Sequence, residues 1–450
     1  MGWACALLAA TASAGCERQS IVYESADPPI DVALRKWLKL SGVAPLEAVP
    51  AQDPALVDLG RALFYDKILS GNRDVSCATC HDPLLETGDG LALSIGTGAT
   101  KQGSKRALGS DRHYVPRNAP SLLNEGFGLV NLFWDARVVQ EFPGARRFRT
   151  PAGAALPTGL ETLLAAQAMF PVLNRTEMRG EIGDKDGLGA PNELAPYGDD
   201  QLAATWDAIM RRLLAIDDYA AKFRAAYPNV PANLLGFEQA ANAIAAYETQ
   251  AFTYVNTPFD RYVGGQDGAL SDEIKQGALV FFTGERCSAC HFGPLLGSRT
   301  FAATATPQVG PGVGEDAPLD RGMSEQFTGQ TRFIFRVPPL RNVELSAPYM
   351  HAGSYATLEA VVRHYADVEK AVRGYDPSQL PADLRSSYHG DAATTSALLA
   401  ALDTRLRQPF NLSETDQKQL VAFLKSLTDP AARDLTALIP ASVPSGLPVR

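Results

Sequence analysis

Two copies of one short motif combine thiol and imidazole side chains at a fixed spacing. The first copy, CATCH, contains Cys77, Cys80 and His81, and the second, CSACH, contains Cys287, Cys290 and His291. The pattern CxxCH attaches c-type haem: its two thiols form thioether bonds to the porphyrin, and the adjacent histidine binds the iron. The sequence therefore predicts two covalently bound haems with His81 and His291 as axial ligands.

Two other uses of paired cysteines fit this chain poorly. A zinc ribbon places its CxxC pairs about 15–20 residues apart, whereas residues 77 and 287 stand much further apart in the chain. A redox dithiol needs no histidine after its second cysteine. Covalent haem also fixes the compartment, because bacteria attach c-type haem outside the cytoplasm. We therefore expect an exported, periplasmic protein.

The segments that must position the two motifs recur in the same order. Each motif follows the pattern G-x-x-[LV]-F-[FY], which begins at Gly60 and at Gly277 and is typical of a helix entering the haem loop. Each motif precedes the pattern P-x-L-x-N, which ends at Asn124 and at Asn342. Patterns that recur in one order indicate a duplicated domain. The expected fold is mainly α, with each copy wrapped around one haem.

The domain organisation follows from length and from the placement of turn residues. A chain of 450 residues exceeds one compact core, so two or more domains are expected. Turn residues cluster at 256–265, which indicates the boundary between the copies. We predict that residues 1–26 form an export or lipoprotein-type signal and linker, in which Cys16 carries the lipid. Residues 27–262 are predicted to form an N-terminal domain and residues 263–428 a C-terminal domain. Residues 429–450 are predicted to form an extended arm.

Composition narrows the class of partner. Hydrophobic residues make up 46% of the chain and charged residues 20%, as in ordinary soluble globular proteins. The net charge of −9 leaves no basic surplus to neutralise phosphate, which argues against a nucleic-acid partner. After the signal, no stretch reaches the roughly 18 consecutive apolar residues that a membrane-spanning helix needs.

A second group of side chains that could bind a metal lies in YMHAGSYATLEAVVRHY, residues 349–365. Thr357 is the expected N-cap of a helix running through TLEAVVRHYADVEKAV. The apolar positions i, i+3, i+4 and i+7 start at Leu358 and end at Tyr365, so these side chains share one face. His364 lies about 100° from that face. Tyr365 is therefore expected to point toward the core and the haem, and His364 toward the flank.

The internal repeat also helps to identify which of these side chains binds the second haem iron. LETLL starts at Leu160 and matches LEAVV, which starts at Leu358, so that Gln167 aligns with Tyr365. Met350 is the commoner type of cytochrome c ligand, but it lies in the turn formed by PYMHAG. We therefore predict Tyr365 as the second axial ligand of the second haem, ahead of Met350, His351 and His364.

The chain resembles the bacterial di-haem cytochrome c peroxidases and their relatives of the MauG type. The resemblance covers residues 59–427 and rests on the two CxxCH motifs and on segments that occur in family order. These segments are SIG, PRNAPS, FWD, AQAMFPVLNRTEM, LRNVELSAPYMHAG and FNLSETDQKQLVAFLKSLT. The resemblance implies a mainly α fold of two cytochrome-c-like domains whose haems face each other across an interface.

The resemblance also implies roles for single residues. Trp134, in FWD, would lie between the haems and relay electrons, and Gln167 and Glu177 would lie on the distal side of the first, peroxidatic haem. A buried carboxylate at Glu177 could take one proton from hydrogen peroxide and return it to the leaving oxygen. Pro171 would pack over the distal face of the same haem.

An inter-haem calcium ion is implied as well. The residues that match its surroundings are Asn118, Ser346 and Pro348, with Ser346 in place of the family's usual threonine. Backbone carbonyls and water are suitable calcium ligands, so this site depends little on side-chain type.

Three positions depart from the pattern of peroxidases that need reductive activation. The histidine that caps the first iron in those enzymes is Thr97 here, and His113 is the only nearby histidine that could replace it. The methionine that binds their second haem is Tyr365 here, as in MauG. However, MauG carries a tryptophan just before its second CxxCH, and here that residue is Glu285. We therefore expect the first haem to be open without reduction.

Two function classes follow from this pattern. The first is an enzyme that reduces hydrogen peroxide at the open first haem, with the second haem and Trp134 relaying electrons from a small cytochrome c or cupredoxin. The second is a MauG-like enzyme that oxidises side chains of a secreted partner protein through a high-valent di-haem state. A plain electron carrier fits poorly, because it gains nothing from an open iron beside Gln167 and Glu177. A homodimer is the assembly we consider for either class.

Overall fold

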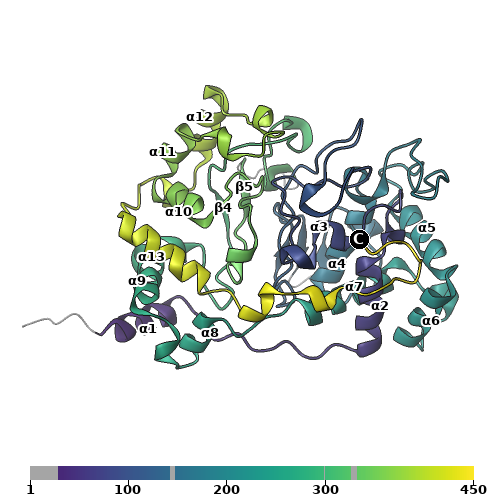
Figure 1. Cartoon of the computed structure of the whole chain (residues 1–450), viewed down its shortest axis with the longest axis horizontal. Coiled ribbons are helices and arrows are strands. Elements are labelled where there is room, and N and C mark those ends of the chain that lie inside the picture. The colour runs from purple at the N-terminus through teal and green to yellow at the C-terminus, as the bar shows by residue number, and fades with distance from the viewer. Residues whose placement is uncertain (1–28, 142–146, 298, 326–331) are drawn as a thin grey trace, which may run out of the picture.

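The computed structural model describes residues 29–141, 147–297, 299–325 and 332–450 (Figure 1). The predicted export signal, including Cys16, lies outside the described residues. The described chain is mainly helical, and its β-structure consists of two small antiparallel sheets. The prediction of a mainly α fold is therefore confirmed.

The helices and strands form two groups that lie side by side in Figure 1. One group contains α2 (Pro54–Tyr65), α3 (Cys77–Cys80), β1 (Asn131–Leu132), β2 (Val138–Gln140), β3 (Phe148–Arg149), α4 (Leu163–Ala168), α5 (Leu202–Leu214), α6 (Asp217–Ala226) and α7 (Phe237–Ala251). The other contains α1 (Ile30–Leu40), α8 (Pro258–Val263), α9 (Asp272–Phe282), β4 (Phe301–Ala303), β5 (Ile334–Arg336), α10 (Leu358–Ala366), α11 (Val368–Arg373), α12 (Ala392–Ala401) and α13 (Glu414–Lys425).

Each group has its own apolar core. The first core is built on α2 and α7 and includes Phe64, Tyr247 and Phe252, whose rings contact one another. The second core is built on α9 and α13 and includes Phe281 and Phe423, with ring centroids 5.1 Å apart. Burial of large aromatic side chains is the main source of stability in such cores. Among the described residues these are the two largest apolar cores, and each contacts one CxxCH loop, through Cys77 and through Cys287.

The repeated glycine of G-x-x-[LV]-F-[FY] has the same function in both groups. A Cβ at Gly60 would lie 1.8 Å from the carbonyl oxygen of Ala243 in α7. A Cβ at Gly277 would lie 1.9 Å from the carbonyl oxygen of Gln419 in α13. Any side chain at either position would push the two helices apart. Glycine is therefore required where the helix leading to each CxxCH motif crosses its neighbour.

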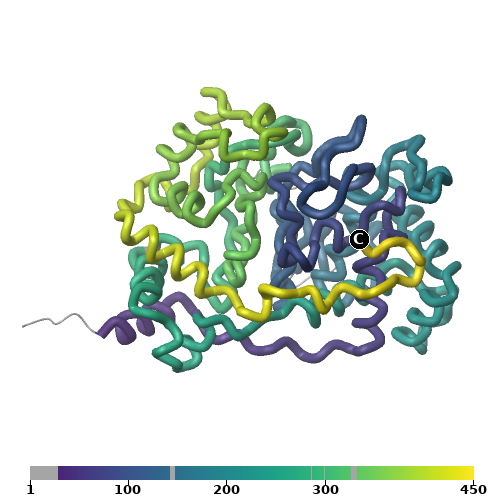
Figure 2. The backbone as a smooth tube through the Cα atoms, viewed as in Figure 1, coloured from purple at the N-terminus to yellow at the C-terminus, as the bar shows by residue number. Residues whose placement is uncertain are grey.

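The two ends of the described chain pack on the group that is remote in sequence. Leu34 and Leu38 of α1 are buried in the second core, although α1 belongs to the first domain by the predicted boundary. Ala432, Leu435 and Val443 are buried in the first core. The tube in Figure 2 shows this C-terminal segment leaving α13 and running along the molecule to the first group. The domain boundaries drawn from sequence stay a prediction.

The helix predicted through TLEAVVRHYADVEKAV is interrupted. Thr357 caps α10 as predicted, accepting a hydrogen bond from the backbone N–H of Ala360 at 3.2 Å. However, α10 ends at Ala366, and Asp367 adopts an extended conformation and caps α11. The single-helix prediction is wrong at this point, because the Asp367 side chain accepts the backbone N–H of Lys370 and so begins a new helix. In the described part of the chain, no helix is long and apolar enough to cross a membrane.

Candidate haem sites

The first CxxCH motif forms a short helix with a fixed histidine. The backbone N–H of Ser76 donates to the Thr79 hydroxyl at 2.9 Å and so caps α3. His81 follows, and its Nδ1 lies 3.1 Å from the carbonyl oxygen of Thr87. A carbonyl only accepts, so Nδ1 carries the proton and Nε2 is left with a free lone pair. Burial lowers the pKa of His81 to about 4, which keeps the imidazole neutral and able to bind iron.

The second motif repeats this arrangement. Nδ1 of His291 lies 2.9 Å from the carbonyl oxygen of Leu296. Burial again lowers the pKa of His291 to about 4. In both loops, a backbone carbonyl that follows the histidine by six or five residues fixes the tautomer of its imidazole. Cys77, Cys80, Cys287 and Cys290 are free thiols.

Each motif lines one cavity. The first cavity measures about 620 Å³, and Cys77, Cys80 and His81 lie in its wall together with Gln167, Pro171 and Glu177. The second cavity is smaller, about 230 Å³. Its wall contains Cys287, Cys290 and His291 together with Tyr365 and Met350. Two free thiols beside a neutral imidazole, in a cavity with apolar walls, are the set of groups that covalent haem requires. The residues of both cavities fit this cofactor.

Trp134 and Asn118 belong to the walls of both cavities. Nε1 of Trp134 donates to the backbone oxygen of Asn118 at 2.9 Å, which fixes the indole ring. The backbone N–H of Arg336 in β5 donates to the backbone oxygen of Trp134 at 2.9 Å, so this residue also joins the two groups of helices. The structure thus places Trp134 between the two candidate haem sites, as the predicted relay role requires.

Glu177 lies in a single π-helical turn, Arg175–Arg179, and lines the first cavity together with His81. The side chain of Asn174 caps this turn and accepts the backbone N–H of Glu177 at 3.0 Å. Gly96, in the SIG segment, packs directly against it. A Cβ at Gly96 would lie 2.0 Å from the backbone oxygen of Thr176, so only glycine allows the contact that positions Glu177.

The electrostatics of the first cavity favour a carboxyl group that can hold a proton. Burial raises the pKa of Glu177, and the positive charges of Arg137 and Arg117 oppose the rise. Gln167 shares the cavity wall and is carried by α4, which Thr162 caps by accepting the N–H of Ala165 at 3.0 Å. A proton acceptor and an amide donor therefore face the same space as the His81 imidazole.

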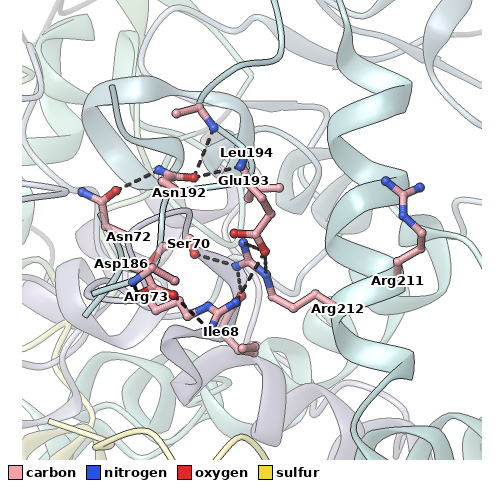
Figure 3. Close-up of polar contacts among 12 residues, drawn as sticks. Ile68, Ser70, Asn72, Arg73, Asp186, Asn192, Glu193, Leu194, Arg211 and Arg212 are labelled. Carbon is pink, nitrogen blue, oxygen red and sulfur yellow. Dashed lines mark hydrogen bonds and ion pairs between the residues drawn. The ribbon is translucent and has the colours of Figure 1, made fainter. Parts of the chain in front are cut away.

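The loop after Glu177 is clamped to the loop before Cys77 (Figure 3). The Asn192 side chain donates to Asn72 at 2.8 Å and to the backbone oxygen of Arg179 at 2.7 Å. Arg212 of α5 donates to the backbone oxygen of Ser70 at 2.7 Å and to Glu193 at 2.8 Å. These polar contacts hold the segment that follows Glu177 against the segment that precedes Cys77.

A buried ion cluster between the two groups of helices was not predicted from the sequence. Arg117 pairs with Asp135 at 2.7 Å and, across the interface, with Asp320 at 2.6 Å. Burial would raise the pKa of Asp135, but Arg117 and Arg137 outweigh it and lower that pKa to about 2. Arg117 lies in PRNAPS and Asp135 in FWD, so the motifs contain the signal, but their pairing with residue 320 is visible only in three dimensions.

The side chains of residues 349–365 separate into two sets. Tyr365 and Met350 both face the second cavity, and the Tyr365 hydroxyl lies 4.0 Å from the Met350 sulfur. His364 is buried at the flank of α10, and its two ring nitrogens lie 2.9 Å from the Tyr355 hydroxyl and from the Thr304 carbonyl. Both nitrogens of His364 are therefore occupied, which leaves it unable to bind the second iron in this arrangement.

His351 lines the same cavity. Its ring stacks on Phe335 at 3.7 Å and meets the edge of Trp134 at 6.5 Å. Asn118, Ser346 and Pro348 also line the second cavity, and the Ser346 hydroxyl donates to the backbone oxygen of Val343 at 3.0 Å. Among the described residues, no group of three or more His, Cys, Asp or Glu side chains forms a metal site.

Neither Thr97 nor His113 reaches the first cavity. The Thr97 hydroxyl is buried and donates to the backbone oxygen of Arg175 at 3.2 Å. His113 is exposed and does not contribute to the cavity wall. Of the histidines in the described part of the chain, His81 is the one that lines this cavity. The described wall of this cavity therefore contains Gln167, Pro171 and Glu177 but no second imidazole.

Comparison with known proteins agrees with this geometry. A family model described as di-haem cytochrome c peroxidase matches residues 54–268. The chain is 26% identical over 431 residues to the methylamine utilization protein MauG of Methylorubrum extorquens, which covers 96% of this chain and 92% of that one. It is 29% identical over 312 residues to the cytochrome c551 peroxidase of Pseudomonas aeruginosa, and this alignment covers 68% of this chain and 70% of the peroxidase.

A crystal structure of a MauG-like protein associated with microbial copper homeostasis matches the fold with a TM-score of 0.55. It is 25% identical to this chain and covers 87% of this chain and 94% of its own. Because this match and the one to MauG span nearly the whole chain, the similarity includes both CxxCH loops. The chain is therefore similar, over most of its length, to the di-haem cytochrome c peroxidases and the MauG proteins.

Proposed function

We propose that the chain reduces hydrogen peroxide to water in the first cavity, with electrons that arrive through the second cavity and Trp134. The observation that carries this proposal is that Gln167 and Glu177 share the wall of this cavity with His81, with no second histidine among the described residues of the wall. A c-type haem held by Cys77, Cys80 and His81 would supply an iron that binds peroxide and accepts its two oxidising equivalents.

The protein's own groups manage the protons. Ionised Glu177 accepts the proton of the peroxide oxygen that faces the iron and returns it to the outer oxygen, which leaves as water. Gln167 donates a hydrogen bond that orients the peroxide. Two electrons and two further protons balance the reduction of one hydrogen peroxide to two waters. His81, fixed by the Thr87 carbonyl, would hold the haem iron.

The first test uses the fully oxidised protein without any reductant. Because Thr97 is turned away and bonded to the Arg175 carbonyl, we expect one high-spin haem and an immediate absorption change when peroxide is added. Stopped-flow spectroscopy would record it. A diferric spectrum that stays unchanged until a reductant is supplied would show that a ligand closes the first haem, and the proposal would fail.

A second candidate function is oxidation of side chains in a secreted partner protein. Tyr365 in the wall of the second cavity favours it, since the peroxidases have methionine there. The near full-length similarity to a MauG protein also supports it. MauG carries a surface tryptophan at the position of Glu285, through which oxidising equivalents pass to its partner protein. Glu285 in its place weighs against the same route here. Turnover of peroxide with a reduced small cytochrome c or cupredoxin would favour the first function, and turnover only with a protein substrate the second.

Several matching contacts support the proposal that the two halves are duplicated cytochrome-c-like domains. Gly60 and Gly277 make equivalent helix crossings. Asn124 and Asn342, which end the two P-x-L-x-N patterns, both have a positive φ, 65° and 62°. The N–H of Asn124 donates to the Phe252 carbonyl and that of Asn342 to the Leu427 carbonyl, both at the end of the partner helix. We assign 27–262 and 263–428 to these domains.

The composition of the exported protein tests the cofactors. When the chain is produced with c-haem maturation, intact-mass spectrometry should show two haems, and each double Cys→Ala variant of one motif should lose one. Elemental analysis should show one calcium ion per chain, for which Asn118, Ser346 and Pro348 are the proposed surroundings. Cell fractionation should recover the protein from the periplasm. One haem, no calcium or cytoplasmic holoprotein would each remove the corresponding part of the proposal.

A further inference from the structure

A line of aromatic rings leads away from the second cavity. It starts at Tyr365 in the cavity wall, whose ring centroid lies 5.2 Å from that of His364. The next centroids follow at 5.3 Å, from His364 to Tyr355, and at 5.6 Å, from Tyr355 to Tyr375. The last step, from Tyr375 to Tyr388, is 4.9 Å. Each ring thus contacts the next, from the candidate haem site to the half-buried Tyr388.

Tyr355 and His364 form a pair suited to losing an electron. Nε2 of His364 lies 2.9 Å from the Thr304 carbonyl, which can only accept, so Nε2 carries the proton. Nδ1 is then unprotonated and accepts the O–H of Tyr355 at 2.9 Å. A phenol that loses an electron also loses its proton, and here the acceptor is already hydrogen-bonded to it. Oxidation of the buried Tyr355 would therefore leave its proton on Nδ1 of His364, and the resulting imidazolium would keep its Nε2–H on the Thr304 carbonyl.

The outer end of the line is held in place and reaches the surface. Tyr375 donates to the backbone oxygen of Ser354 at 2.6 Å. Tyr388 pairs with Val309 through a β-bridge, and a Cβ at Gly390 would lie 2.3 Å from the Tyr388 hydroxyl. Tyr388 is half-buried, and Gly390 beside it is exposed. The absence of a side chain at Gly390 thus leaves room for the phenol of Tyr388.

We propose that Tyr365, His364, Tyr355, Tyr375 and Tyr388 form an electron-transfer route from the second haem site to the protein surface. The route rests on the proposed function, because hydrogen peroxide is the oxidant that would withdraw electrons from these rings. It would replace the exit that MauG provides with a tryptophan at the position of Glu285.

Each transfer moves one electron inward. An external one-electron reductant gives an electron to oxidised Tyr388 and is itself oxidised. The half-buried Tyr388 and Tyr375 regain from solvent the phenolic protons that they lost on oxidation. The electron passes on to Tyr355, which takes back its proton from Nδ1 of His364, and then through the rings of His364 and Tyr365 to the second haem site. Two such transfers, with two protons from solvent, complete the reduction of one hydrogen peroxide to two waters. Tyr388 is therefore the site where an electron donor would act.

Trapping of a tyrosyl radical at Tyr388 tests the route. The diferric holoprotein is mixed with peroxide and a nitroso spin trap, without a reductant, and the modified residue is located by peptide mass spectrometry. We expect the adduct on Tyr388 in the wild type and its loss from Tyr388 in Tyr355→Phe and Tyr375→Phe. The control Tyr227→Phe removes a half-buried phenol that donates to the Gln239 carbonyl in the first group, and should leave the adduct in place.

The absorption change is recorded in the same samples, so that two failures can be told apart. If peroxide leaves the oxidised spectrum unchanged, the proposed function fails and the route fails with it. If the spectrum responds but Tyr388 carries no adduct, or still carries it in Tyr355→Phe, the route alone is overturned. Both haems in each variant are verified by intact mass before the comparison.

Discussion

Replacing Glu177 by glutamine is expected to slow the reaction with hydrogen peroxide by about a hundredfold or more, the usual range for loss of a general acid–base group. Glutamine keeps the size and the hydrogen-bonding reach of the side chain but cannot accept and return a proton. Both haems should stay attached, because Glu177 contacts neither CxxCH motif by a hydrogen bond. Stopped-flow measurement of the first absorption change gives the rate.

The pH dependence of the same rate identifies the carboxyl group. Burial raises the pKa of Glu177, so the protonated form persists to higher pH than for an exposed glutamate. The base must be ionised, so the rate should rise as pH increases through that raised pKa, and Glu177→Gln should abolish the rise. The exposed neighbour Glu181 provides the control, and Glu181→Gln should retain both rate and profile. An unchanged rate in Glu177→Gln would remove this residue from the mechanism.

Replacing Tyr365 by phenylalanine is expected to abolish the low-spin electron paramagnetic resonance signal of the second haem. The ring and its packing remain, but the oxygen that would bind the iron is gone. An anionic phenolate favours ferric iron, so spectroelectrochemistry should also show a higher reduction potential for that haem in the variant. His291, Cys287 and Cys290 are unaffected, so the haem itself should remain attached.

Met350 provides the decisive comparison, because its sulfur lies only 4.0 Å from the Tyr365 hydroxyl in the same wall. Met350→Leu keeps the apolar volume and should leave the low-spin signal intact. The opposite pair of results, or a sulfur-to-iron absorption band in the oxidised wild type, would assign the ligand to Met350. The chain would then resemble the donor-dependent peroxidases at this haem.

Local patterns in the sequence were sufficient to identify the two haem loops. CxxCH carries its chemistry within five residues, and the G-x-x-[LV]-F-[FY] repeat specifies a helix crossing at which only glycine fits. The face of α10 that carries Tyr365 followed from helical periodicity, which depends only on spacing. These features were predictable because neighbouring residues determine them.

Features that depend on distant residues were not predictable. The sequence placed His364 off the apolar face, but its bonds to Tyr355 and to the Thr304 carbonyl depend on how α10 meets β4 and the loop after it. The Arg117–Asp320 pair joins residues from different halves of the chain, and no spacing rule relates them. The break at Asp367 was missed because an aspartate within an otherwise periodic segment can either stay on the surface or cap a new helix.

The C-terminal segment that packs on the first core has a consequence for how the protein unfolds. Ala432, Leu435 and Val443 are buried in the core beside the first CxxCH motif, although α13, which precedes them in the chain, belongs to the second core. The first core is therefore incomplete without residues that follow the second group of helices. The two groups are thus expected to lose their structure in one cooperative transition rather than one after the other.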